Sequence, residues 1–271
     1  MALVDNGTFE KLIGEVLPAV ANVEGHLTGR EMRCLALLAA RPCAKGVILE
    51  IGSFKGRSAI ILAKSAALAG ETKIVAVDPL TSPSKTDPDL RGKLDGWADF
   101  KMNLKNAGVE EAVEFHKERS SDFARRWDPA RKIRLLWIDG DHTYAGAKLD
   151  FDLFSSFLAN GAIVAMHDVL HAPGGPARVF AEDVLLSPHF AAFGFSGSIA
   201  WAQYFASPEV SLPFRSDKVK GYQKLTRLIA LSAFDSVPRG WNKLCHKLAR
   251  FRIPHGDVQL EEFNRQVSPA K

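Results

Sequence analysis

Two short runs of polar residues have the composition of a reactive site in this chain of 271 residues. One is Asp139-Gly140-Asp141-His142 and the other is His167-Asp168, and each directly follows an apolar run. Asp139, His167 and Asp168 together offer two carboxylates and one imidazole, a donor set that suits a divalent metal with positions open for substrate oxygens. His142 follows Asp139 by about one helical turn, so its imidazole is placed to accept a proton from a group held there.

Both histidines also fit roles that involve no chemistry. His167 could be a hydrogen-bonded histidine at the end of a strand, and His142 could cap or pack a helix. The joint occurrence with Asp139 and Asp168 favours a reactive site over two unrelated structural histidines.

A third run, Glu50-Ile51-Gly52-Ser53-Phe54-Lys55-Gly56-Arg57-Ser58, points to a bound cofactor. Its two glycines allow a sharp turn and a close approach of the backbone to a ligand. Asp78 ends the next apolar run, where a carboxylate can accept hydrogen bonds from both hydroxyls of a ribose. These features indicate a nucleoside-containing cofactor. A dinucleotide is less favoured because Gly52 and Gly56 are four positions apart, which is not the G-x-G-x-x-G spacing.

These residues need a framework that brings the ends of strands together. Apolar runs predict buried strands that alternate with helices, which indicates a parallel sheet covered on both faces. Residues 193–204 predict two strands around a Ser-Gly-Ser turn, and so tight a connection requires one antiparallel strand. The other expected strands are 47–51, 73–78, 113–116, 133–139 and 162–166, and the expected helices between them are 58–69, 97–107, 144–158 and 176–186. The predicted fold class is α/β, a doubly wound and mostly parallel sheet of seven strands, which binds ligands at the carboxyl ends of its strands.

Segments flank this alternating pattern on both sides. In the first of them, Pro18 is expected to end one helix, and Thr28 and Glu31 to form a capping box at the start of the next. Residues 79–95 contain three prolines, directly follow Asp78 and are interpreted as a lid over the cofactor. The predicted division is an N-terminal helical cap over 1–40, a catalytic domain over 41–206 and a basic helical extension over 207–271.

Composition excludes several classes of protein. Apolar residues make up 46% and charged residues 24%, the proportions of a globular chain rather than of a disordered or fibrous one. No apolar run is long enough for a transmembrane helix, and charges near the N-terminus argue against a secretory signal. The three cysteines are an odd number without a C-x-x-C pair, so neither a disulfide framework nor a cysteine zinc site is expected. A cytoplasmic location follows as the expectation.

The net charge of +4 is unevenly distributed. Residues 215–252 contain ten Lys/Arg against two Asp/Glu, a net +8, so the rest of the chain sums to −4. Within this segment Trp241, Leu244, Cys245, Leu248 and Phe251 fall on one face of an expected helix, with basic residues around them. Packing on the protein itself or homodimerisation is the favoured interpretation, followed by peripheral contact with the cytoplasmic membrane face. No nucleic-acid partner is expected, because the basic residues are not interleaved with exposed aromatic platforms.

Together the motifs resemble those of class I S-adenosylmethionine-dependent methyltransferases over residues 24–206. The run from Glu50 to Ser58 is similar to the first motif of catechol O-methyltransferase-like enzymes. The runs 139–142 and 167–168 are similar to those of the macrocin O-methyltransferase and cephalosporin-hydroxylase-like group, which methylates hydroxyls of sugars or natural products. Many metal-dependent members of that group have a carboxylate where this chain has His167, and this difference bears on the metal.

The resemblance implies a role for each residue of the motifs. His142 would be the general base, Asp78 would hold the ribose and Ser120 would face the adenine. The implied metal is Mg²⁺, Mn²⁺ or a borderline transition metal, held by Asp139, His167 and Asp168. The implied binding residues for S-adenosylmethionine are Glu50, Gly52, Ser53, Phe54, Gly56, Ser58, Asp78, Ser120 and Asp139.

The function expected on this basis is metal-assisted O-methylation of a hydroxyl on a sugar, a glycan or a glycosylated small molecule. One alternative is a methyltransferase for catechol- or phenol-type small molecules. Another is a cofactor-binding scaffold without transferase activity, against which the intact Asp78, Asp139 and His142 argue.

Overall fold

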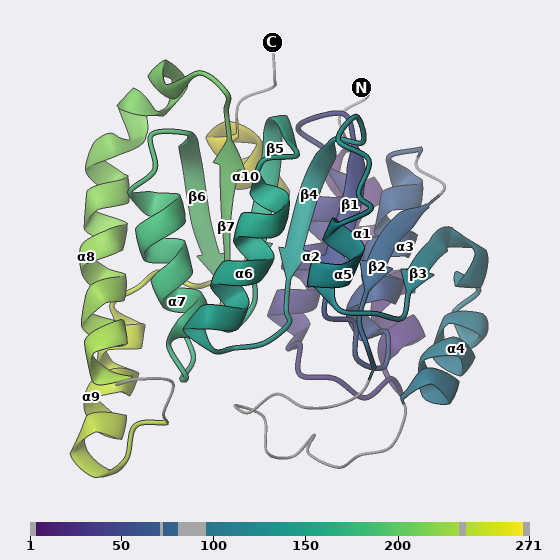
Figure 1. Ribbon diagram of the computed structural model, residues 1–271, viewed down its shortest axis with the longest axis horizontal. Helices are drawn as coiled ribbons and strands as arrows, with labels where there is room; N and C mark the ends of the chain where they lie inside the picture. Colours follow the sequence, from purple (N-terminus) through teal and green to yellow (C-terminus); the bar gives the residue numbers. More distant parts are fainter. Residues whose placement is uncertain (1–3, 71–72, 81–95, 233–236, 268–271) are drawn as a thin grey trace.

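The computed structural model describes residues 4–70, 73–80, 96–232 and 237–267, and the segment 81–95, predicted as most of a lid, lies outside them (Figure 1). Its centre is a seven-stranded sheet in the order β3-β2-β1-β4-β5-β7-β6. All neighbouring pairs from β3 to β5 are parallel, and β7 runs antiparallel to both β5 and β6. The strands are β1 (Val47–Ile51), β2 (Ile74–Val77), β3 (Val113–His116), β4 (Ile133–Ile138), β5 (Leu158–Met166), β6 (Phe190–Ser196) and β7 (Ile199–Tyr204).

Helices cover both faces of the sheet, so successive side chains of a strand enter two different cores. In β4, for example, Leu135 and Trp137 pack in one cluster, and Leu136 and Ile138 pack in the other. The first cluster lies under α1 (Asn6–Val20), α2 (Gly29–Ala40), α3 (Arg57–Leu68), α4 (Trp97–Asn106) and α10 (Leu260–Gln266). The second lies under α5 (Ser120–Ala124), α6 (Tyr144–Ser155), α7 (Gly175–Val179), the π-helix Phe180–Leu185 and α8 (Arg215–Leu231). Figure 1 shows α5, α6 and α7 in front of the sheet and α1, α2 and α10 behind it.

The N-terminal helices follow the sequence signals with one exception. The capping box of α2 is present, with Thr28 and Glu31 bonded reciprocally, as predicted. The prediction for Pro18 was wrong, because α1 continues to Val20 with Pro18 inside it. A proline this close to the end of a helix removes only one hydrogen bond before the helix stops.

The later elements differ from the prediction at their edges. β5 begins at Leu158, four residues earlier than expected, because its first residues pair with the start of β4 across a register shift. The short helix α5 was not predicted. The C-terminal extension includes α9 (Gly240–Phe251), and α10 adds Phe263 to the first cluster, where the Phe263 ring meets the ring of Trp201 at 5.0 Å between centroids.

Candidate functional site

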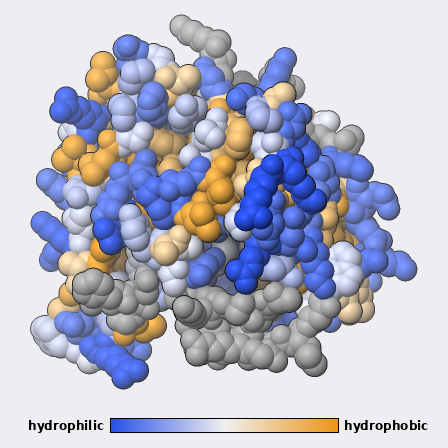
Figure 2. Space-filling view, in the orientation of Figure 1, coloured by the Kyte–Doolittle hydropathy of each residue, from blue (hydrophilic) through white to orange (hydrophobic). Residues whose placement is uncertain are grey.

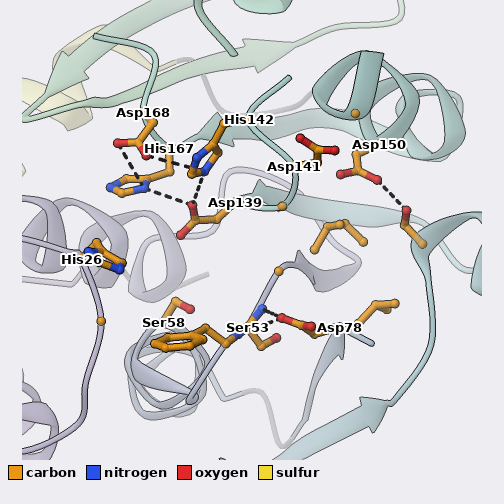
Figure 3. Close-up of a pocket in the computed structure, with 18 of the residues that line it drawn as sticks. His26, Ser53, Ser58, Asp78, Asp139, Asp141, His142, Asp150, His167 and Asp168 are labelled. Atoms are coloured by element: carbon orange, nitrogen blue, oxygen red, sulfur yellow. Dashed lines mark hydrogen bonds and ion pairs between the residues drawn. The ribbon is translucent and has the colours of Figure 1, made fainter. Parts of the chain in front are cut away.

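A cleft of ≈ 1190 Å³ opens at the carboxyl ends of β1, β2, β4 and β5. This is the edge at which an open α/β sheet binds its ligands. Figure 3 shows that its labelled side chains converge from separate loops and helices rather than from one segment. Of the residues predicted from the sequence, those that line the cleft are Gly52, Ser53, Phe54, Ser58, Asp78, Ser120, Asp139, His142, His167 and Asp168.

The glycine loop after β1 has a backbone shape that restricts its residues. Gly52 has φ +88°, and a side chain there would place its Cβ 2.2 Å from the carbonyl oxygen of Asp139. Gly56 has φ +90° and stands at the N-cap of α3. Gly56 does not line the cleft, so its place in the motif serves the turn that leads into the helix.

Asp78 holds this loop in place. One carboxylate oxygen accepts hydrogen bonds from the backbone N–H groups of Ser53, at 2.7 Å, and Phe54, at 2.8 Å. The other oxygen accepts from the N–H of Leu80 at 2.6 Å. A carboxylate has about four acceptor positions, so about one remains for a ligand. The structure therefore gives Asp78 room for one ribose hydroxyl in this arrangement, rather than the two that the sequence suggested.

Backbone strain is concentrated at the cleft. Among the described residues, the non-glycine positions with positive φ are Phe54 (+46°), Leu80 (+51°) and Asp168 (+54°). All three line the cleft. Strained backbone of this kind persists where the surroundings over-determine it, and it is enriched at functional sites.

The predicted reactive residues do come together. Asp139 Oδ1 lies 3.0 Å from His167 Nδ1 and 3.5 Å from His142 Nε2. Asp168 Oδ2 lies 3.5 Å from His142 Nε2, and Asp168 Oδ1 lies 3.5 Å from His167 Nδ1 (Figure 3). The two imidazoles are thus held between the same two carboxylates. Gly175 of α7 completes the site, because a Cβ there would meet the carbonyl oxygen of His142 at 2.3 Å.

A third carboxylate, that of Glu31 in α2, lies close to His167. Glu31 is 1% exposed and its Oε2 lies 3.8 Å from His167 Nε2. Its Oε1 accepts hydrogen bonds from the backbone N–H of Ser198, at 2.6 Å, and from the Ser198 hydroxyl, at 2.7 Å. Sequence reasoning identified Glu31 as a capping residue only. The structure shows that it also ties α2 to the β6–β7 turn directly behind the site.

Exchange of this carboxylate tests that link. We expect Glu31→Gln to lower the free energy of unfolding by ~2–4 kcal/mol, because a buried charged partner of several hydrogen bonds is lost. The pKa of Glu31 lies below its usual value because His167 and the hydrogen bonds outweigh its burial. The stabilisation is therefore present above the ordinary carboxyl pKa and is lost as the pH falls through the folded value. Chemical denaturation at several pH values measures it.

The matched control is Glu10→Gln, which removes a carboxylate from a surface pair with Arg33. Glu10 is half exposed, and such pairs contribute about 1 kcal/mol or less. Equal losses in the two variants would contradict the role assigned to Glu31.

The carboxylates determine the protonation of both histidines. Burial lowers the pKa of His142, but Asp139 and Asp168 outweigh it, and the net pKa is raised above its usual value. The same balance raises the pKa of His167 far more, with Asp139 and Asp168 as the main causes and Glu31 in addition. The surrounding carboxylates thus favour the protonated form of His167.

This arrangement does not support the metal site expected from the sequence. A metal ligand needs a neutral imidazole nitrogen, whereas His167 Nδ1 lies 3.0 Å from Asp139 and its Nε2 lies 3.8 Å from Glu31, so both nitrogens face carboxylates. Among the residues that the structure describes, no group of three or more His, Cys, Asp or Glu side chains is arranged to hold a metal ion. The donors Asp139, His167 and Asp168 are used in ion pairs with one another.

At the far end of the cleft Ser120 and Asp150 form a pair, of which only Ser120 was predicted from the sequence. Ser120, the first residue of α5, donates a hydrogen bond of 2.5 Å to Asp150 of α6. Burial raises the pKa of Asp150 to about 6. Asp150 was missed, although a carboxylate on the buried face of a predicted helix, between Ala147 and Phe154, is itself a signal.

Glu50 lies beneath the cleft rather than on its wall. It is fully buried, and its Oε2 accepts a hydrogen bond of 2.6 Å from the Ser53 hydroxyl. Burial raises its pKa to about 8, and Asp139 and Asp78 add to that effect. Its Oε1 has no hydrogen-bond partner. Glu50 is therefore mostly uncharged at neutral pH, and a cationic ligand beside it would favour its ionised form. The sulfonium and ammonium groups of S-adenosylmethionine are cationic.

Comparison with known proteins agrees with this fit. Residues 49–169 match a protein family described as a methyltransferase domain. That range contains the glycine loop, Asp78, His142 and the pair His167-Asp168.

Solved structures, two of them O-methyltransferases by name, share the fold at low sequence identity. The O-methyltransferase NovP superposes with a TM-score of 0.55 at 11% identity, over 73% of this chain and 98% of NovP. TomG from Streptomyces achromogenes, solved with S-adenosylmethionine, gives 0.51 at 18% identity, over 76% of this chain and 93% of TomG. The cofactor-bound protein Rv0187 from MTB gives 0.53 at 19% identity, over 74% and 90%.

The strand order with its antiparallel β7, the glycine loop and Asp78 at the end of β2 define a nucleoside-cofactor fold of the methyltransferase type. With the family match, they identify residues 49–169 as a methyltransferase domain of this fold.

Proposed function

We propose that this methyltransferase transfers the methyl group of S-adenosylmethionine to a hydroxyl oxygen of a small molecule, with His142 as the general base. The observation that carries the proposal is the position of His142 on the wall of the cleft, 3.5 Å from both Asp139 and Asp168. NovP and TomG, which share the fold, are O-methyltransferases by name, and TomG is described as involved in tomaymycin synthesis. The description of TomG supports a small-molecule acceptor.

Each residue has a defined task in this scheme. S-adenosylmethionine, when bound, supplies an electrophilic methyl group on a positively charged sulfur. Asp78 and the glycine loop position the ribose end, and Ser120 with Asp150 faces the adenine end. His142 accepts the proton of the acceptor hydroxyl, and Asp139 and Asp168 stabilise the imidazolium that forms. Most of the rate enhancement then comes from positioning and electrostatics.

A phenolic acceptor fits these residues better than the sugar hydroxyl expected first. A phenol has a pKa of about 10, whereas a sugar hydroxyl is a much weaker acid. Because the donor set does not fit a metal that would acidify the hydroxyl, an unaided imidazole favours the more acidic group. Apolar side chains of Leu27, Phe54, Leu80 and Leu149 also line the cleft and suit an aromatic ring.

The test is turnover with methyl-labelled S-adenosylmethionine and three acceptor groups: catechols and simple phenols, free sugars, and glycosylated metabolites. We expect label in the phenolic group and stoichiometric S-adenosylhomocysteine. Label only in a sugar would establish the first-expected acceptor. Tight cofactor binding without label in any acceptor or in a cell extract would favour the scaffold alternative and overturn the proposal.

Metal dependence is tested separately. We expect exhaustive chelation to leave the turnover of a phenolic acceptor within about twofold of its starting value, because His167 holds the position of a cation among the carboxylates. Elemental analysis of the protein before and after chelation is the control. Loss of activity that returns on addition of Mg²⁺ or Mn²⁺ would restore the metal-assisted mechanism.

A further inference from the structure

Helix α9 presents its apolar side to solvent. Trp241 is 75% exposed, Phe251 is 71% exposed, and Leu244 and Leu248 are exposed between them. No residue of the helix is buried. The side that faces the protein carries the half-buried residues Cys245, His246, Ala249 and Arg250. A helix that merely covered its own protein would bury the apolar stripe, so this orientation is the reverse of self-packing.

The surroundings of the stripe are strongly basic. Lys243 and Lys247 lie on the same exposed side, each within one helical turn of a stripe residue. Figure 2 shows hydrophobic and hydrophilic side chains next to one another at the lower left, where α9 lies. Residues 237–252 contain no Asp or Glu, and their five basic residues are Arg239, Lys243, Lys247, Arg250 and Arg252.

The protein-facing side of α9 lies near the cleft. His246 is close enough to His171 for the charge of His171 to contribute to lowering the His246 pKa, after burial and Arg250. His171 lines the cleft. Figure 1 shows α9 at the lower end of the molecule, where β4 also ends, so a surface that met α9 would lie at the same end of the molecule as the cleft.

From this geometry we propose that the exposed side of α9, defined by Trp241, Leu244, Lys247, Leu248 and Phe251, docks on an anionic lipid surface. Apolar side chains that include a tryptophan, flanked by lysines, are the composition of a helix that lies in the membrane interface. No helix among the described residues combines the length and hydropathy that are needed to span a bilayer, so the contact is peripheral. The proposal is independent of the acceptor assigned above.

Charge argues against the other partners. A second copy docked through the same side would bring two segments of like charge together around a symmetry axis. A nucleic acid would neutralise the lysines but leave Leu244 and Leu248 without an apolar partner. An anionic bilayer suits both the basic residues and the apolar stripe. Its headgroups pair with Lys and Arg, and the stripe is buried at the boundary of its acyl chains.

The test is co-sedimentation of the full chain with vesicles of phosphatidylcholine that contain about 30 mol % phosphatidylserine, against phosphatidylcholine alone. We expect binding to the anionic vesicles, with a steep loss of binding as salt is added. Lys243→Glu/Lys247→Glu and Trp241→Ala/Phe251→Ala should each weaken partitioning at least tenfold.

The matched control is Lys11→Glu/Lys105→Glu, which makes the same change in net charge on α1 and α4. It should bind vesicles within about twofold of the unaltered chain. Binding of S-adenosylhomocysteine shows whether each variant is folded. Failure of the unaltered chain to bind anionic vesicles, or equal binding by all variants, would overturn the proposal. So would a dimer in sedimentation that Trp241→Ala/Phe251→Ala dissociates without any vesicle binding.

Discussion

His142→Gln is expected to lower kcat for a phenolic acceptor by about 10²–10⁴-fold, the range by which a positioned general base accelerates a reaction. S-adenosylhomocysteine should bind this variant within about threefold of the unaltered affinity, because the proton acceptor is not among the residues expected to hold the cofactor. Steady-state kinetics and calorimetry on the same preparation separate the two effects.

The pH profile gives a second readout of the same residue. A protonated imidazole cannot accept a proton, so kcat/KM should fall as the pH drops through the pKa of His142. Asp139 and Asp168 raise that pKa, which places the falling limb above the usual histidine value of 6.5. The residual activity of His142→Gln should lack this limb.

The control is His116→Gln. His116 also pairs with a carboxylate, that of Glu114 at 3.0 Å, but it is not among the residues of the cleft. The His116→Gln variant should have the kcat and the pH profile of the unaltered enzyme within error. A His142→Gln enzyme with more than about one third of the original kcat would remove His142 from the mechanism.

The sheet was predictable because its strands are short apolar runs rich in Val, Ile and Leu that alternate with helical segments. Its edges were less so. The first residues of β5, from Leu158, include asparagine and glycine, and they form a strand because β4 offers them partners. Pro18 shows the same limit, since local rules cannot tell a proline that ends a helix from one within its last turn.

The residues of the site that follow the ends of strands were predictable from the sequence. The residues that a distant segment of the chain brings to the site were not. Asp139, His142, His167 and Asp168 converge as the topology requires. The partner of Glu31, Ser198, is 167 positions away, and nothing near Glu31 in the sequence indicates it.

The position of Glu31 beside His167, which the sequence did not indicate, changed the chemistry expected at that histidine. In the sequence, two carboxylates and a histidine predict metal ligands. In the structure, Glu31 adds a third carboxylate to those of Asp139 and Asp168. Together they raise the pKa of His167 and favour its cationic form. The direction of α9 was equally hidden, because periodicity shows that a helix has an apolar side but not where that side points.

Replacement of Asp78 should have the largest effect on cofactor affinity. Its carboxylate accepts three backbone hydrogen bonds, two from the glycine loop and one from Leu80 in the loop that follows Asp78. Asp78→Asn keeps the shape but turns one acceptor oxygen into an NH₂ donor that faces an N–H group. Hydrogen bonds to a charged group contribute ~1.5–3 kcal/mol each, so we expect a loss of at least about 100-fold in S-adenosylhomocysteine affinity by calorimetry.

Two experiments distinguish loss of this carboxylate from a general disturbance of the cleft. One is a control variant, and the other is binding of ligands that lack one ribose hydroxyl. Asp99→Asn removes another carboxylate of the cleft, one that pairs with Lys55 at the surface, and should change affinity by less than about threefold. With about one acceptor position of Asp78 left for the ribose, removal of one of the two ribose hydroxyls should weaken binding to the unaltered protein more than removal of the other. That difference should vanish in Asp78→Asn. Unaltered affinity in Asp78→Asn, or equal losses for both deoxy ligands in the unaltered protein, would show that Asp78 holds the loop alone and does not touch the cofactor.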